Sequence, residues 1–309
     1  MPSATTDLDG CSEGHRTPGQ VPGRSTAGGR ERSRVIGLVT DSNAQLPGDL
    51  RERYQVAVVP LTVVVDDHPY QEGVDITAAE FYGRLAAGAS VSTAAPSPGA
   101  VLTAYEQLAA AGATEILSIH IGSNTSATVN AVTVAAGSSP VPVEVIDTGT
   151  ASFAVACCVW AAGEVLAAGG DLARAADVAR RVAGQVGNVF IVGALDLARR
   201  GGRLAADAAA GEGLPVLALA DGQIEAVGRV HDVESAVDAM TAYVVDGAGG
   251  APQRVGVGDA LTPELAGEYA ARLADRPEVA ELVRYEIGPS VGAHTGAGTV
   301  GACFFPAAS

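Results

Sequence analysis

The sequence predicts an α/β protein with two α/β domains. The first has a mainly parallel sheet covered by helices on both faces, and the second has a mixed sheet and helices. Two observations lead to this fold class. In the first half, short apolar runs alternate with segments of helical pattern, as strands and helices do around a parallel sheet. In the second half the runs are shorter, and Asp221-Gly222 between two of them is a strong β-hairpin signal.

The chain is expected to divide into three parts. Residues 1–33 are rich in Gly, Pro, Ser and Thr and lack an apolar block, which is typical of a disordered tail rather than a secretory signal. Residues 34–183 form the first domain and residues 184–306 the second, since 309 residues can fill two cores. No run reaches the ~18 apolar residues of a membrane span, so we expect a cytoplasmic protein without an integral membrane segment.

The elements of the first domain follow in strand and helix order. The first strand ends at Asp41-Ser42, the kind of position where open α/β sheets bind ligands, although a helix cap explains the pair as well. Thr77 and Glu80 match a capping box, and Pro98 fits the first turn of a helix. The predicted strands span residues 35–40, 56–65, 115–121 and 143–148, and the predicted helices start at residue 76 or span residues 97–111, 127–136 and 152–168.

The second domain begins with a change of pattern. A helix that starts after Gly169-Gly170-Asp171 runs to about residue 186, and shorter apolar runs follow it. Hairpin-like strands mixed with helices favour a mixed sheet with its helices on one side. The predicted strands span residues 189–192, 215–220, 223–229, 253–258 and 282–287, and the predicted helices span residues 233–245 and 263–274.

The charged residues and cysteines exclude several classes of protein. All 19 basic residues are arginine. A Walker A loop, a protein kinase and a pyridoxal phosphate or Schiff-base enzyme each need a lysine, so these classes are excluded. A net charge of −16 repels nucleic acid. The four cysteines show no C-x-x-C spacing and no cluster with histidine, so we expect neither a metal site nor a disulfide framework.

Two hydroxyl-rich segments are candidate anion sites. Thr93 through Gly99 reads as a rigid turn before a helix, where a hydroxyl and backbone N–H groups can face an anion. A Ser97 cap followed by Pro98 explains this pattern equally well. Gly122-Ser123-Asn124-Thr125-Ser126 ends a buried strand and opens a helix, a favoured place for a carboxylate or phosphate. Helix capping explains one of its hydroxyls and hardly all three.

Two further segments carry positive charge or imidazole. Arg199, Arg200 and Arg203 flank a glycine pair, and a solvated helix C-terminus explains the first two better than Arg203. His294 lies among glycines in residues 288–298, which lets a ligand approach the backbone closely beside an imidazole. A structural role for His294 stays equally open. The other histidines show no ligand spacing and are interpreted as structural or solvated.

Motifs of two common enzyme classes are missing or incomplete. Residues 296–301 match G-x-G-x-x-G, but only eight residues follow, too few for a dinucleotide-binding unit, so nicotinamide binding is rejected. The G-x-S-x-G elbow of α/β hydrolases is absent. An acyl-ester hydrolase with Ser123 as nucleophile and His294 as base stays open, because the sequence does not reveal the distance between them.

In order along the chain, these motifs resemble the DegV family of fatty-acid-binding proteins, which includes the FakB subunit of bacterial fatty acid kinase. The resemblance covers residues 35–305. Any one segment is weak evidence, but seven in register are specific. The segments are Thr40-Asp41-Ser42 with Leu46-Pro47, Gly73 through Thr77 with Phe81-Tyr82, Thr93 through Gly99, Ile119 through Thr128, Val145 through Thr148, Arg200 through Arg203, and Gly292 through Gly296.

The resemblance implies that a long-chain fatty acid lies between two α/β domains, with its tail in the first. Thr93 and Ser123 would hydrogen-bond the carboxylate, and Arg203 and His294 would support them. The fatty-acid-binding residues implied in this way are Thr93, Ser123, His294, Arg203, Ser126 and Gly122.

The resemblance also implies a role without catalysis. The chain would present the acid to a separate ATP-dependent kinase subunit, which makes an acyl phosphate for phospholipid synthesis. No catalytic residue, no metal, no cofactor beyond the bound fatty acid and only transient membrane contact are expected. This sequence departs from the family's Thr-Ser-Gln-Pro-Ser at Ala94 and Ala95, and from its Ser-Ser at Gly122. A lipid sensor without a kinase partner stays an alternative.

Overall fold

The computed structural model describes residues 34–307, with gaps at 201, 203–204, 206–207 and 209–210. The predicted tail, residues 1–33, lies outside the described residues. From Arg34 onward the chain forms one compact unit. None of the helices in the described part is long and apolar enough to cross a membrane.

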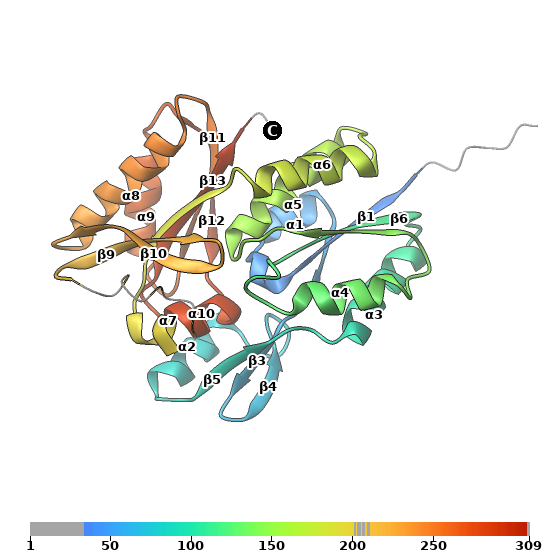
Figure 1. The fold of residues 1–309 in the computed structure, drawn as a ribbon, viewed down its shortest axis with the longest axis horizontal. Helices are drawn as coiled ribbons and strands as arrows, with labels where there is room; N and C mark the ends of the chain where they lie inside the picture. Colours follow the sequence, from blue (N-terminus) through green and yellow to red (C-terminus); the bar gives the residue numbers. More distant parts are fainter. Residues whose placement is uncertain (1–33, 201, 203–204, 206–207, 209–210, 308–309) are drawn as a thin grey trace, which may run out of the picture. The chain divides into compact units, whose positions relative to one another are not determined.

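The first half of the described chain contains a four-stranded sheet whose strands are all parallel, in the order β2-β1-β6-β7. Figure 1 shows α3 and α4 on one face of this sheet and α5 and α6 on the other. The predicted fold class is confirmed in this part. The elements are β1 (Ile36–Asp41), β2 (Val56–Val59), β6 (Glu115–His120), β7 (Val143–Asp147), α3 (Pro98–Ala110), α4 (Thr128–Ala136), α5 (Phe153–Ala167) and α6 (Leu172–Ala183).

The predicted strand over residues 56–65 is wrong as a single element. It breaks at Pro60 into β2 and β3 (Thr62–Val65), because a proline has no N–H for the ladder. β3 instead pairs antiparallel with β4 (His68–Gln71) and β5 (Val91–Ala94) in a separate three-stranded sheet. Thr93 therefore lies in β5, opposite Val63, rather than in the turn that the sequence suggested.

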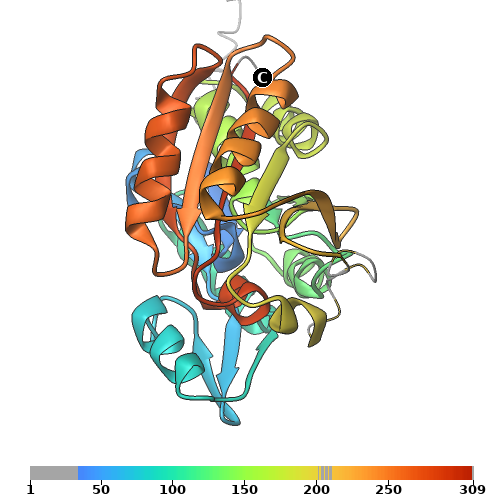
Figure 2. The same ribbon diagram turned by 90° about the vertical axis from the view of Figure 1, so that its left-hand side faces the viewer.

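The second half forms a six-stranded mixed sheet in the order β10-β9-β8-β13-β11-β12, with β11 and β12 parallel and the other pairs antiparallel. Figure 2 shows α8 and α9 side by side in front of its strands. The elements are β8 (Gly187–Ile191), β9 (Leu214–Ala220), β10 (Gln223–Val230), β11 (Gln253–Asp259), β12 (Val279–Glu286), β13 (Val300–Pro306), α8 (Val233–Gly247) and α9 (Pro263–Ala274).

Several short elements complete the described chain. The glycine-rich segment 288–298 contains a short helix, and the segment after it forms the central strand β13. Pro289 occupies the first turn of that helix. Tertiary contacts stabilise such short helices more than their own propensity does. These elements are η1 (Ser42–Ala44), α1 (Gly48–Arg53), α2 (Ala78–Ala86), α7 (Leu195–Arg200) and α10 (Pro289–Thr295).

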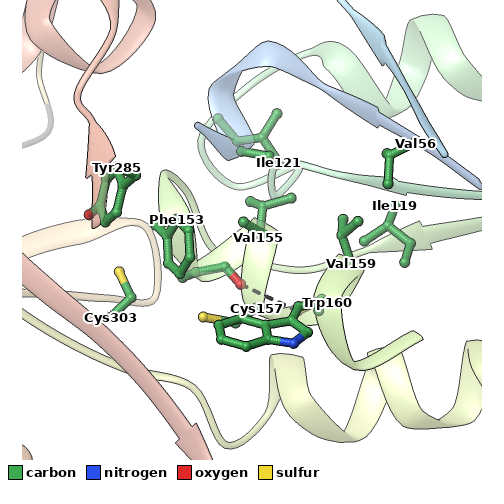
Figure 3. Packing of buried hydrophobic residues seen from close by; sticks show 14 of the residues in the cluster. Val56, Ile119, Ile121, Phe153, Val155, Cys157, Val159, Trp160, Tyr285 and Cys303 are labelled. Atoms are coloured by element: carbon green, nitrogen blue, oxygen red, sulfur yellow. Dashed lines mark hydrogen bonds between the residues drawn. The ribbon is translucent and has the colours of Figure 1, made fainter. Parts of the chain in front are cut away.

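Helix α5 joins the cores of the two larger sheets. All of its residues from Phe153 to Gly163 are buried, and it contacts β1 and β6 of one sheet and β13 of the other. Figure 3 shows Phe153 beside Tyr285, and the two rings stack at 4.4 Å with an interplanar angle of 12°. The largest hydrophobic cluster thus combines residues from both sides of Ala183, and the domain boundary expected there stays a prediction.

Candidate functional site

A cavity of about 360 Å³ lies beside α10, within the usual size range of small-molecule sites, roughly 300–1,000 Å³. Residues from both halves of the chain line it, and most of the larger side chains among them are aliphatic or aromatic. Such a surface favours an apolar ligand over a polar one. The apolar lining residues with larger side chains are Leu61, Ile121, Val189, Phe190, Leu219, Ile224, Ile287 and Val291.

One part of this cavity is polar. The Oγ1 of Thr93 on β5 lies 3.2 Å from the Nε2 of His294, close to the C-terminal end of α10. Both residues line the cavity, and so does Ser126. The Ser126 hydroxyl is 2.9 Å from the hydroxyl of Thr128 at the start of α4. Two hydroxyls and an imidazole on a largely apolar surface can bind a carboxylate, because its charge needs hydrogen-bond donors once it leaves water.

Contacts from the first half of the chain hold the N-terminal end of α10. The buried carboxylate of Glu72 accepts from the backbone N–H of Ser290 at 2.8 Å and from the Ser42 hydroxyl. The Asn43 amide donates to the Ser290 hydroxyl at 3.2 Å. The Tyr82 hydroxyl donates to the carbonyl of Ile287 at 2.8 Å. Because α10 carries His294, these bonds also set the position of the imidazole.

Burial shifts the pKa of two of these groups. Desolvation raises the pKa of Glu72, although hydrogen bonds from Ser42, Ser290 and Gln45 act in the opposite direction. Burial also raises the pKa of Tyr82 well above its ordinary value. The carboxyl group that holds α10 is therefore more easily protonated than an exposed one.

The loop 122–126 is folded against the loop that follows β7. The N–H of Gly122 donates to the carbonyl of Thr150 at 2.7 Å, and a Cβ at Gly122 would come within 2.6 Å of the Gly149 carbonyl carbon. Only glycine fits there. The N–H of Ser123 donates to Asp147 Oδ1 at 3.0 Å, as does the N–H of Gly149. Partial burial raises the pKa of Asp147, but these bonds and one from the Ser123 hydroxyl lower it below the ordinary value.

The structure distributes the six sequence-predicted site residues differently. Thr93, His294 and Ser126 line the cavity, whereas Ser123 and Gly122 do not line it. Ser123 is exposed, and its hydroxyl faces Asp147. Arg203 lies outside the described residues.

The polar residues that line the cavity also include Asn43, Ser152, Asn188 and Ser290, which the sequence did not mark as site residues. The Asn43 side chain donates to the Ser290 hydroxyl, and Ser152 donates its N–H to Asn43 Oδ1 at 2.8 Å. Asn188 of β8 binds the backbone of β9. None of the four belongs to a motif of spaced polar residues, so no local signal marked them. Only their position in the fold brings them to the cavity.

A second histidine, interpreted from the sequence as structural or solvated, belongs to a buried hydrogen-bonded chain. His120 Nδ1 lies 2.9 Å from Asp41 Oδ2, and its Nε2 lies 2.7 Å from the Ser118 hydroxyl. Tyr105 completes the chain at 2.8 Å from Ser118. All four side chains are buried, and none lines the cavity. Asp41 also accepts from the N–H groups of Asn43 and Ile121, so it organises the ends of β1 and β6.

The contacts do not assemble the nucleophile and base of a hydrolase. His294 pairs with Thr93, and Ser123 pairs with Asp147. Among the described residues no hydrogen bond joins Ser123 to His294. The Asp41, His120 and Ser118 group has the residue types of a hydrolytic triad, but Ser118 is fully buried and cannot reach a substrate. In the described part of the chain, no three His, Cys, Asp or Glu side chains are grouped to hold a metal ion.

Comparison with known proteins identifies the family. A family model described as "Uncharacterised protein, DegV family" matches residues 35–307. A DegV domain-containing protein of Streptomyces coelicolor is 39% identical over 274 residues, which cover 87% of this chain and 98% of that protein.

Solved structures agree. The structure described as "Fatty Acid Binding of a DegV family Protein from Thermus thermophilus" has a TM-score of 0.81. It is 32% identical to this chain, over 88% of this chain and 99% of that one. DegV from Bacillus subtilis, described as a fatty acid binding protein, has a TM-score of 0.80 and 25% identity, over 89% of this chain and all (100%) of that one. The chain belongs to the DegV family.

Proposed function

We propose that this chain binds a long-chain fatty acid in the cavity beside α10. The observation that carries the proposal is the Thr93 and His294 pair, which forms a polar group on a largely apolar surface. The relatives from Thermus thermophilus and Bacillus subtilis, both described as fatty acid binding, support the same ligand class.

The acyl chain supplies most of the affinity in this proposal. Burying a sixteen-carbon chain offers on the order of 10 kcal/mol before the costs of association, at roughly 0.8 kcal/mol per CH₂. Hydrogen bonds to the carboxylate add about 1.5–3 kcal/mol each. The polar end therefore sets the orientation of the ligand, and it selects an acid over an ester or an alcohol.

The carboxylate contacts divide into two groups. Thr93, His294 and Ser126 bind the carboxylate directly, because they line the cavity. Ser123 acts through the loop: its bonds to Asp147 hold residues 122–126 against the loop after β7, which brings Ser126 to the cavity. Arg203 lies outside the described residues, and its role as a supporting cation stays what the family resemblance implies.

We further propose that the bound acid is presented to a separate ATP-dependent kinase subunit, which forms the acyl phosphate. The absence of lysine supports this division of labour, since the chain lacks the residue that most ATP sites use on the phosphates. In this proposal the chain carries the substrate and is not itself an enzyme.

Native mass spectrometry of the purified protein tests the binding step. The expected result is an added mass equal to that of a fatty acid. It should be lost in the double variant Thr93→Val with His294→Leu and retained in Thr103→Val, which changes a threonine of α3 outside the cavity. Equal occupancy in all three proteins would contradict the assigned carboxylate contacts.

The kinase step needs a second experiment. The loaded protein is incubated with ATP and a fatty acid kinase subunit, and acyl phosphate is trapped with hydroxylamine. ATP-dependent product supports the presenting role, whereas fatty acid binding without any product favours a lipid sensor. Hydrolysis of acyl esters by the chain alone would favour the hydrolase instead.

A further inference from the structure

The β9–β10 hairpin forms one wall of the cavity, and its backbone pairing with β8 is short. Leu219 of β9 and Ile224 of β10 both line the cavity. Between β8 and β9 only one residue pair, Phe190 with Leu217, has ladder geometry. Figures 1 and 2 both show β9 and β10 running at a steep angle to β11 and β13. The hairpin therefore diverges from the sheet on the side of the cavity.

A single side chain occupies the point of divergence. The register that pairs Phe190 with Leu217 would place Asn188 opposite Leu219. Instead of a backbone pair, the Asn188 side chain makes both bonds to Leu219: its Nδ2 donates to the carbonyl at 2.9 Å, and its Oδ1 accepts from the N–H at 2.6 Å. The amide reproduces the donor and acceptor of a peptide group, so the backbone of Leu219 stays satisfied without the ladder.

The turn of the hairpin, which directly follows Leu219 and Ala220, lies beside Asn124. Gly222 in this turn has a φ of +77°, and a Cβ there would lie 3.1 Å from the Asn124 side chain. Asn124 in turn donates to the carbonyl of Gly149 at 3.1 Å. The turn thus lies against the loop that carries Ser126, at the same end of the hairpin as Leu219. Beyond the Phe190 and Leu217 pair, the Asn188 side chain fills the space between β8 and β9, so this space depends on Asn188.

We propose that Asn188 is a specificity-determining residue: its amide keeps β9 apart from β8 and thereby sets how much of an acyl chain the cavity admits. The inference rests on the proposed function for its ligand, but the separation of β8 and β9 by the Asn188 side chain is a property of the protein alone. Without the amide, Leu219 regains its partners only by pairing with the backbone of residue 188. That closure narrows the cavity between Val189, Phe190 and Leu219.

The first test measures binding of saturated fatty acids of increasing length to the wild type and to Asn188→Ala. The expected result is a selective loss for the longest acids, on the order of tenfold relative to the short ones, the factor for about two methylenes left unburied. Asn188→Gln keeps the amide and should restore the wild-type profile. Asp232→Ala removes the cap of α8 and controls for lost stability, since Asp232 accepts from the N–H of Ser235 and lies outside the cavity.

A crystal structure of Asn188→Ala tests whether the Asn188 side chain separates β8 from β9. This test does not require that fatty acids bind. It should show residues 188 and 219 as a backbone pair at the ladder spacing of about 4.5–5.5 Å between Cα atoms. An unchanged separation, or a length profile identical to that of the wild type, would overturn the inference. If the wild type binds no fatty acid, the proposed function fails, and the spacing in the crystal still decides the role of Asn188.

Discussion

In the described part of the chain, His120 and His294 each lie within hydrogen-bond distance of a hydroxyl, and of these two only His294 lines the cavity. His120 is 2.7 Å from Ser118 and 2.9 Å from Asp41, and all three side chains are fully buried. His294 is 3.2 Å from Thr93, and both line the cavity. The shorter distances belong to the closed group. Residue types and distances alone therefore do not identify a binding site, and access to the cavity separates the two groups.

The largest expected effect comes from breaking the closed group. His120→Leu removes the imidazole that joins the carboxylate of Asp41 to the hydroxyl of Ser118 in a fully buried site. We expect it to lower the free energy of unfolding by about 3–5 kcal/mol, as measured by urea denaturation. His294→Leu should lower it by less than about 1 kcal/mol. Similar losses in the two variants would mean that the two histidines do not differ as described.

Substitutions in the group that faces the cavity, Thr93 and His294, should lower fatty acid affinity more than stability. Thr93→Val keeps the shape of the side chain but removes a hydroxyl that binds the carboxylate. We expect fatty acid affinity to fall roughly 10- to 100-fold, the equivalent of about 1.5–3 kcal/mol, in a calorimetric titration. Thr103→Val, on an exposed face of α3, should leave the affinity unchanged. A stability loss in Thr93→Val without any change in affinity would assign Thr93 to the structural group.

Glu72 should make the stability of the protein depend on pH, because its carboxyl group is buried and binds the helix that carries His294. Burial raises its pKa above the ordinary value of 4.5, so the folded state favours the protonated form. The stability that this raised pKa contributes is fully present at a pH below the pKa of Glu72 in the unfolded chain. It is lost as the pH rises through the pKa of Glu72 in the folded protein. Unfolding free energies of the wild type and Glu72→Gln, measured between about pH 4 and 8, should show the wild type losing stability relative to the variant as the pH rises. Parallel curves would contradict this.

The smallest effect is expected at Ser123. Its hydroxyl faces Asp147 rather than the cavity, so Ser123→Ala should weaken fatty acid binding less than about threefold, a loss of roughly 0.5 kcal/mol. Ser126→Ala removes a hydroxyl that lines the cavity and should weaken binding more. Titration of both variants with one fatty acid decides the order, and a larger loss for Ser123→Ala would return that residue to the carboxylate contacts.

Much of the fold follows from the sequence because its signals are local. The Thr77 and Glu80 capping box, the Ser97 cap with Pro98 and the Asp221-Gly222 turn all form as predicted. These signals depend on residues within a few positions of one another. Strand β13 escaped prediction because it follows a glycine-rich segment, and its central place depends on pairing with β8 and β11.

The candidate site was less predictable. Thr93 and His294 are 201 positions apart, and only the family resemblance suggested that they act together. The direction of the Ser123 side chain depends on Asp147, which belongs to another strand. Asn188 carries no sequence signal at all, because its role follows from the register of β8 and β9. Contacts between distant segments therefore decide which of the predicted polar residues reach the cavity.

The most direct test of the carboxylate site compares a fatty acid with its methyl ester in calorimetric titrations of the wild type and Thr93→Val. The two ligands have the same acyl chain, so their difference in affinity isolates the polar end. We expect the wild type to prefer the acid by at least about tenfold, and the preference to shrink strongly in Thr93→Val. An equal preference for the acid in both proteins would show that the carboxylate binds elsewhere and would contradict the site described.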